Sequence, residues 1–342
     1  MNSNLISIDL AKNVFQVCVF NQNGKVVSNK KVKRQALRET LQQQPPSTVV
    51  MEACYSAHYW GRELEKMGHQ VKLIPAQHVK PFVRGNKNDA NDAVAIAEAS
   101  QRPKIRFVPV KTVEQQDIQM IHRVRQRHVE ARTALVNQIR GLLSEYGIVV
   151  EIGWRKLKAQ LPLITEDAEN GLSPLAREGM ALLYEELVEA GRLVEEDDRR
   201  LVAHLQDNED YQHLLAAPGF GPILSSAAVA SIGNGAQFAS GRELAAWIGL
   251  TPLGVASGDK STLRGISKRG NRYLRTLFIH GARAIVNWCE KKSDPLNEWI
   301  KALMARRGRH KAIVALAHKM ARFAWVMLSR KEPYRAPAAV PS

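Results

Sequence analysis

Residues 4–32, NLISIDLAKNVFQVCVFNQNGKVVSNKKV, decide the fold of the N-terminal part of this 342-residue chain. The apolar run at residues 4–10 predicts a buried strand, and the alternation over residues 15–20 predicts a second strand. The turn signal Asn-Gln-Asn-Gly precedes a third strand over residues 25–32. The segment therefore predicts three strands in succession, with a hairpin between the second and the third.

The elements that follow alternate between helix and strand. We expect a helix over 36–43, a strand over 47–51, a helix over 59–67, a strand over 70–74 and a helix over 88–100. The order β-β-β-α-β-α-β-α resembles that of the ribonuclease-H-like fold, in which the first and fourth strands are neighbours. Sugar-kinase and actin-like proteins share the β-β-β-α start, but they need glycine-rich phosphate loops, and the early candidate here is a lone Gly85. The expected class is a mixed-sheet α/β domain followed by mainly α-helical parts.

Four carboxylates stand at the ends of these elements. Asp9 and Glu52 end the first and fourth strands, so they could face each other across neighbouring strand ends. Asp89 and Asp92 are three residues apart at a helix start, on one face of a turn. Each has an ordinary alternative, helix capping for the last two and a polar strand end for the first two. Together they predict a site for a hard divalent cation such as Mg²⁺, which keeps positions open for phosphate.

The composition points to a polyanionic partner. The formal net charge is +16, and residues 260–335 hold 19 Lys and Arg against 4 acidic residues. Nucleic acid is the first candidate and an anionic membrane surface the second, and we expect no uninterrupted apolar stretch long enough to span a bilayer. The alternative is a solvated helical face. Cys18, Cys54 and Cys289 suit a reducing cytoplasm, and the N-terminus lacks a signal-peptide pattern.

The middle of the chain predicts two long antiparallel helices. Over residues 113–146, a near-heptad seam of apolar or small residues passes through His128, which we expect to be a packed or bridging histidine and not a ligand. The second helix begins at Ser173-Pro174 and runs to about 206, with Met180, Leu187, Val194 and Leu201 at seven-residue spacing. Such an arm could serve dimerisation or pack within one chain.

The C-terminal region carries two further motifs. The turn around Gly219 and Gly221 resembles a helix-hairpin-helix motif, whose glycines let backbone N–H groups approach a phosphate, although tight helical turns also use glycines. Ser257 lies beside Gly258 in a basic loop, where cations would favour attack on a phosphodiester. A lone serine in such a loop is more often a phosphate contact, and composition does not select Ser257 over Ser261 or Ser267. The candidate nucleic-acid-binding cations are Lys260, Arg264, Lys268, Arg269, Arg272 and Arg275.

Taken together, these segments resemble the DEDD-type insertion-sequence transposases, the bridge-RNA-guided serine recombinases. The match covers nearly the whole chain, and its most specific signatures are Lys87–Ala93, Pro218–Pro222, Gly249–Pro252 with Ser257-Gly258, and Ile266–Arg275. The resemblance implies a RuvC-like catalytic domain over 1–110, a coiled-coil linker over 111–210, a C-terminal transposase domain over 211–330 and a disordered tail over 331–342.

The resemblance also implies a mechanism. Asp9, Glu52, Asp89 and Asp92 would bind Mg²⁺, with Mn²⁺ as a substitute, and Ser257 would form a phosphoserine link to DNA. Partners would be donor and target double-stranded DNA, a structured noncoding guide RNA from the same element, and further copies in a dimer and a synaptic tetramer, acting in the bacterial cytoplasm on the nucleoid. Two rival functions are a junction-resolving nuclease that uses metal-activated water alone and a non-catalytic nucleic-acid-binding protein.

Overall fold

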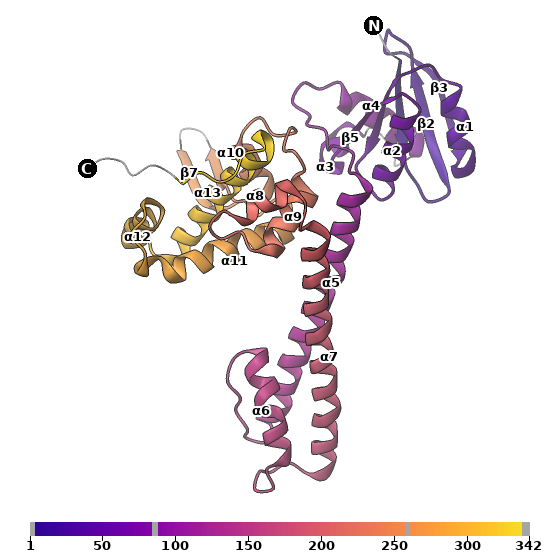
Figure 1. Ribbon diagram of the computed structural model, residues 1–342. Helices are drawn as coiled ribbons and strands as arrows, with labels where there is room; N and C mark the ends of the chain where they lie inside the picture. Colours follow the sequence, from indigo (N-terminus) through magenta and orange to yellow (C-terminus); the bar gives the residue numbers. More distant parts are fainter. Residues whose placement is uncertain (1–3, 84–87, 258–259, 337–342) are drawn as a thin grey trace. The chain divides into compact units, whose positions relative to one another are not determined.

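The computed structural model describes residues 4–83, 88–257 and 260–336, with the backbone alone for residues 255–257, 260 and 261. It contains two compact units, Met1–Val113 and Glu114–Ser342 (Figure 1). Each unit is described by itself below.

The first unit is built on a five-stranded mixed sheet. The strands are β1 (Leu5–Asp9), β2 (Val14–Phe20), β3 (Val26–Lys33), β4 (Thr48–Glu52) and β5 (Gln70–Ile74). Their order is β3-β2-β1-β4-β5. Strand β2 pairs antiparallel with both β1 and β3, whereas β4 pairs parallel with both β1 and β5. The expected adjacency of the first and fourth strands is confirmed.

Helices cover both faces of this sheet because side chains alternate along the strands. The helices are α1 (Leu37–Gln42), α2 (Ala57–Lys66), α3 (Ala76–Val79) and α4 (Asp89–Ser100), with 3₁₀ turns at Arg34–Ala36 and Lys80–Phe82. On one face, Ile6 and Ile8 of β1 pack with α1 and α2. On the other face, Val50 and Ile74 pack with α4. Helix α3 was not expected from the sequence.

The second unit begins with long helices. They are α5 (Val113–Ser144), α6 (Trp154–Glu166) and α7 (Pro174–Leu205). Ser173 caps α7 as expected, because its Oγ accepts the Ala176 N–H at 3.2 Å. The two long helices run antiparallel, since Val136 and Leu143 of α5 pack in one cluster with Leu187 and Met180 of α7. Helix α6, which was not expected, packs into the same cluster.

The predicted seam is correct on α7 and partly wrong on α5. Met180, Leu187, Val194 and Leu201 are all buried. In the seam predicted over residues 113–146, Ile139 is buried as expected, but Val124, Leu142 and, beyond the end of α5, Tyr146 are 41–42% exposed. The α5 residues Ile118, His122, Val136 and Leu143 are buried instead. His128 bridges the helices as expected, with its Nδ1 2.7 Å from Oδ2 of the buried Asp197.

The rest of the second unit is a helical core with one hairpin. Its helices are α8 (Glu209–Leu215), α9 (Pro222–Ile232), α10 (Gly241–Ile248), α11 (Arg272–Trp288), α12 (Pro295–Arg307) and α13 (Arg309–Arg330), with a 3₁₀ turn at Cys289–Lys291. Strands β6 (Pro252–Ser257) and β7 (Lys260–Ile266) form an antiparallel pair that the sequence did not predict. The expected disordered tail is described as far as Ala336, and Tyr334 packs against Phe323 with ring centroids 5.3 Å apart. Residues 337–342 lie outside the described residues.

Helix α13 is the one described helix with the length and composition of a membrane span, at a mean hydropathy of 1.3. The sequence alone led us to expect no such stretch. The apolar residues of α13 include Leu316, Met320 and Ala324, which are buried in the core cluster of the second unit. Its hydropathy is therefore explained by core packing.

Candidate metal centre and nucleic-acid surface

Asp9 and Glu52 end neighbouring parallel strands. Ile8 of β1 stands in register with Met51 of β4, so the next residue on each strand is an acid. Because the carboxyl ends of parallel strands meet at one edge of the sheet, both acids lie at that edge. Each is half-buried. The register of the strand pair thus places two of the four predicted carboxylates.

Helix α4 brings Asp89 and Asp92 to the same edge. Asn88 caps the helix, because its Oδ1 accepts the Ala90 N–H at 3.0 Å, so both acids fall in the first turn. The small side chains of Ala93 and Ala97 pack against Cys18 and Phe20 of β2. Capping therefore does occur here, but it is done by Asn88, which leaves both aspartates to other partners.

Polar side chains of the sheet fix this turn of α4. The buried Ser7 Oγ donates to the Ala93 carbonyl at 2.6 Å. Asn29 Nδ2 donates to the Ala90 carbonyl at 3.2 Å, and Gln16 Nε2 donates to Asn29 Oδ1 at 2.6 Å. Sequence reasoning missed these three positioning residues. For Ser7, the sequence does offer one indication of such a role, because a serine is unusual inside the apolar run of β1.

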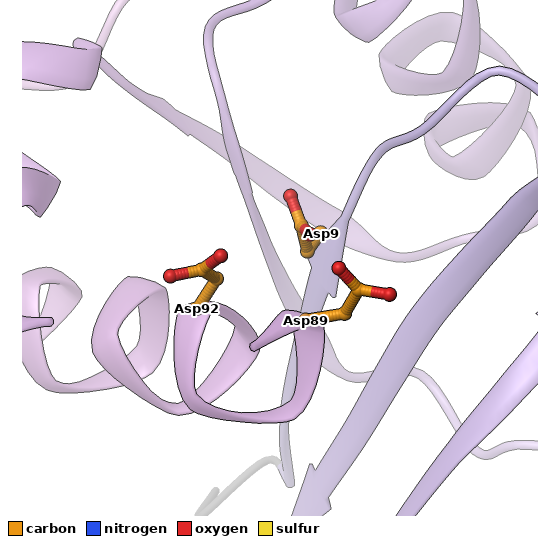
Figure 2. A group of neighbouring side chains, drawn as sticks. All are labelled: Asp9, Asp89 and Asp92. Atoms are coloured by element: carbon orange, nitrogen blue, oxygen red, sulfur yellow. The ribbon is translucent and has the colours of Figure 1, made fainter. Parts of the chain in front are cut away.

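Three of the predicted carboxylates converge. Ligand oxygens of Asp9, Asp89 and Asp92 all lie within 4.8 Å of one another (Figure 2). Asp89 is exposed and pairs with Lys31 Nζ at 3.5 Å, while Asp9 and Asp92 are half-buried. A set made of carboxylate oxygens suits hard cations such as Mg²⁺, Mn²⁺ or Ca²⁺. The residues present therefore fit a divalent cation.

Glu52 lies beside this cluster but outside the group of three. Burial, and then the charge of Asp92, raise the pKa of the Glu52 carboxyl above its usual value. Burial, and then the negative charges of Glu52 and Asp9, raise the pKa of the nearby Cys54 thiol to about 11. The negative charges therefore disfavour one another, and a bound cation would relieve that repulsion.

The predicted nucleophile lies in the β6–β7 hairpin of the second unit. Ser257 is the last residue of β6 and pairs with Lys260 of β7, while Gly258 lies outside the described residues. Ser267 follows β7 and its backbone N–H donates to the Thr251 carbonyl at 2.8 Å. The backbone alone does not select among the serines.

The predicted nucleic-acid-binding cations differ in their exposure to solvent. Arg264, Lys268, Arg269 and Arg272 are exposed. Arg275 is a correction, because it is buried and its Nη1 donates to the carbonyls of Ile248 and Arg269 at 2.9 and 3.1 Å. Its guanidinium closes the end of α10 and is not available to a phosphate.

The two glycines of the predicted helix-hairpin-helix turn have different roles. Gly219 has a φ of +80°, and a Cβ there would lie 2.7 Å from Ile285 Cδ1 and 3.1 Å from the Gly281 carbonyl oxygen. Packing against α11 therefore explains this glycine. At Gly221, which precedes α9, a Cβ would meet nothing within 4 Å. The surroundings of Gly221 therefore do not require a glycine, and its predicted phosphate contact stays a prediction.

We expect Gly219→Ala to lower the free energy of unfolding by about 1–3 kcal/mol, because it combines an unfavourable φ with overpacking. Gly221→Ala is the matched control and should cost less than about 1 kcal/mol. Urea unfolding followed by circular dichroism would measure both. Equal losses would contradict the packing explanation of Gly219.

We expect Mg²⁺ to stabilise the wild-type protein by about 1.4 kcal/mol at ten times its Kd, because binding favours the folded state. Asp92→Asn should raise the metal-free melting temperature slightly by relieving repulsion, and should abolish the Mg²⁺-dependent increase. Thermal unfolding with and without Mg²⁺ measures this. Glu39→Gln, at an exposed acid of α1, is the control. A Mg²⁺ shift that Asp92→Asn leaves intact would place the cation elsewhere.

Known transposases are similar to this chain over nearly its whole length. Residues 6–148 match a family model of DEDD-type IS110 elements described as "Transposase", and residues 211–298 match "Transposase IS116/IS110/IS902 family". A "Probable family 20 transposase" of Pseudomonas aeruginosa is 46% identical over 98% of this chain and 99% of its own length. The "Transposase for insertion sequence element IS1111A" of Coxiella burnetii is 45% identical over 97% of this chain and 91% of its own. The family expected from the sequence is thereby confirmed, and this chain belongs to the IS110-type insertion-sequence transposases.

Proposed function

We propose that this chain cuts and rejoins DNA for an insertion sequence by combining a metal-binding carboxylate site with a serine nucleophile. The observation that carries the first half is the convergence of Asp9, Asp89 and Asp92 to within 4.8 Å, with Glu52 beside them. The sheet order is that of the RuvC-like nuclease domain we infer for the first unit. The family membership supplies DNA as the substrate.

The carboxylates would hold Mg²⁺ or Mn²⁺, which, when bound, neutralises charge on the scissile phosphate. Ser257 is proposed to attack that phosphorus through its Oγ. The bond from phosphorus to the 3′ oxygen breaks, the serine gives up its proton, and the departing oxygen takes one up as a 3′-hydroxyl. A 3′-hydroxyl of another strand then attacks the phosphoserine, which rejoins the DNA and restores the serine.

The surroundings of the hairpin support this assignment of Ser257. Arg264, Lys268, Arg269 and Arg272 are exposed on β7, the following loop and the start of α11. Their positive charge would stabilise the additional negative charge of a pentavalent phosphate. The carboxylates and Ser257 belong to different compact units of the chain. We propose that a complete site takes them from different protomers of a dimer, two of which form the synaptic tetramer.

Sequence specificity is proposed to come from a structured noncoding RNA of the same element. In RNA-guided systems, base pairing reads the sequence while protein holds the backbone. The excess of arginine and lysine in the C-terminal third, most of it exposed among the described residues, suits backbone contacts of that kind. The enzyme would act on donor and target DNA in the bacterial cytoplasm, at the nucleoid.

A covalent adduct tests this proposal. Full-length protein would be incubated with the noncoding DNA of its element transcribed as RNA, labelled donor and target DNA, and Mg²⁺, and then resolved on a denaturing gel. We expect wild type to form a protein–DNA adduct that Ser257→Ala and Asp9→Asn both lose, while Ser261→Ala and Ser267→Ala retain it.

Two results would contradict the serine mechanism. If Ser257→Ala kept the adduct, another residue would be the nucleophile. If DNA were cleaved without any adduct and only Asp9→Asn abolished cleavage, the chain would act as a junction-resolving nuclease with metal-activated water.

A further inference from the structure

A cavity of about 600 Å³ opens in the second unit, apart from the hairpin that holds Ser257. It is lined by the Pro218-Gly219 turn, by the end of α11, by the start of α12 and by Tyr334. Its size lies in the range of small-ligand pockets and would admit one nucleotide. Neither the carboxylates nor the basic hairpin uses this cavity.

One wall of the cavity is aromatic and cationic. Trp288, the last residue of α11, is 58% exposed although it is a large apolar side chain. Lys291 Nζ lies 4.7 Å from the centre of its ring, and Lys292 also lines the cavity. An exposed indole offers a stacking surface for a planar base, and adjacent ammonium groups suit the phosphate attached to it.

Asn297, one of the residues that line the cavity, has a buried acceptor without a donor. Asn297 is 4% exposed, and its Oδ1 has no hydrogen-bond partner. Its Nδ2 donates to Asp294 Oδ2, which can only accept, so the amide orientation is fixed and the oxygen is the free atom. The other carboxylate oxygen of Asp294 accepts the backbone N–H groups of Leu296 and Asn297.

A buried acceptor of this kind calls for an N–H donor, because leaving it unpaired costs about 1–3 kcal/mol. Nucleobases carry N–H donors at their pairing edge, and a free phosphate or an alkyl chain does not. Within a duplex that edge is occupied by the partner base. The combination of indole, lysines and amide oxygen therefore fits a nucleotide that is neither paired nor stacked.

We propose that this cavity binds a single unpaired nucleotide of a nucleic-acid strand, with the base on Trp288, its N–H donor on Asn297 Oδ1 and its phosphate near Lys291 and Lys292. The inference rests on the proposed function only in taking nucleic acid as the partner, and it is independent of cleavage. A single-stranded segment of DNA or of RNA offers this chemistry, and the test separates the two.

Photocrosslinking tests the proposal directly. Full-length wild type, without divalent metal so that no strand is cut, would be irradiated with 12-nucleotide DNA or RNA carrying one central 5-iodouracil. The same oligonucleotides annealed to a complement are the paired control. After trypsin digestion, we expect the crosslink on the peptide Ala284–Lys291 with the single strands, and at least fivefold less with the duplexes. The better-labelled strand identifies the source of the nucleotide.

A matched pair of tryptophan variants completes the test. Trp288→Leu should weaken single-strand binding about fivefold or more in fluorescence anisotropy and leave duplex binding unchanged, because base stacking is worth about 1–3 kcal/mol. Trp247→Leu, at a 39% exposed tryptophan of α10, should change neither. Crosslinks confined to other peptides, or equal single-strand affinity of Trp288→Leu and wild type, would overturn the proposal even if recombination itself were fully active.

Discussion

The close packing of α4 on β1 is the constraint on which the candidate active site depends. Alanines at positions 93 and 97 let the helix approach the sheet. The buried hydrogen bond from Ser7 Oγ to the Ala93 carbonyl, 2.6 Å long, fixes the rotation of the helix about its axis. That position brings the first turn of α4, with Asp89 and Asp92, to the strand end that carries Asp9. A larger residue at position 93 or 97 would move the carboxylates apart, because packed interiors do not absorb an added methylene without shifts.

Acidic and basic side chains are distributed unevenly along this chain. At this sheet edge, burial and then the nearby charge of Asp92 raise the pKa of the Glu52 carboxyl. Most of the chain's positive excess lies in its C-terminal third and is remote in sequence from this cluster. The acidic cluster and most of the basic side chains thus belong to different parts of the sequence. The mechanism proposed above requires both groups at the same phosphate.

Much of the first unit could be predicted from the sequence, because its signals are local. The alternation of β2 and the apolar run of β1 fixed strand positions, and the fold resemblance correctly placed β1 beside β4. The carboxylate cluster followed from strand ends and a helix start. Ser7, Gln16 and Asn29 were missed, because their roles arise from contacts between elements that no local pattern reveals.

The second unit was harder to predict for the same reason. The buried positions of α5 differ from the predicted seam because α5 also packs on α6 and on the core helices, through Leu143 and Ile118 respectively, whereas Val124 is exposed. Arg275 was predicted from the sequence as a surface cation, but it is buried and donates to backbone carbonyls. The cavity beside Trp288 depends on the meeting of a turn, two helices and the C-terminal residues, which spacing alone could not indicate.

Anomalous diffraction from crystals soaked in Mn²⁺ would show whether the carboxylate cluster binds a divalent cation. We expect an anomalous peak within coordination distance, about 2.0–2.4 Å, of oxygens from Asp9 and at least one of Asp89 and Asp92. Peaks at other acidic residues with none at this cluster would contradict it.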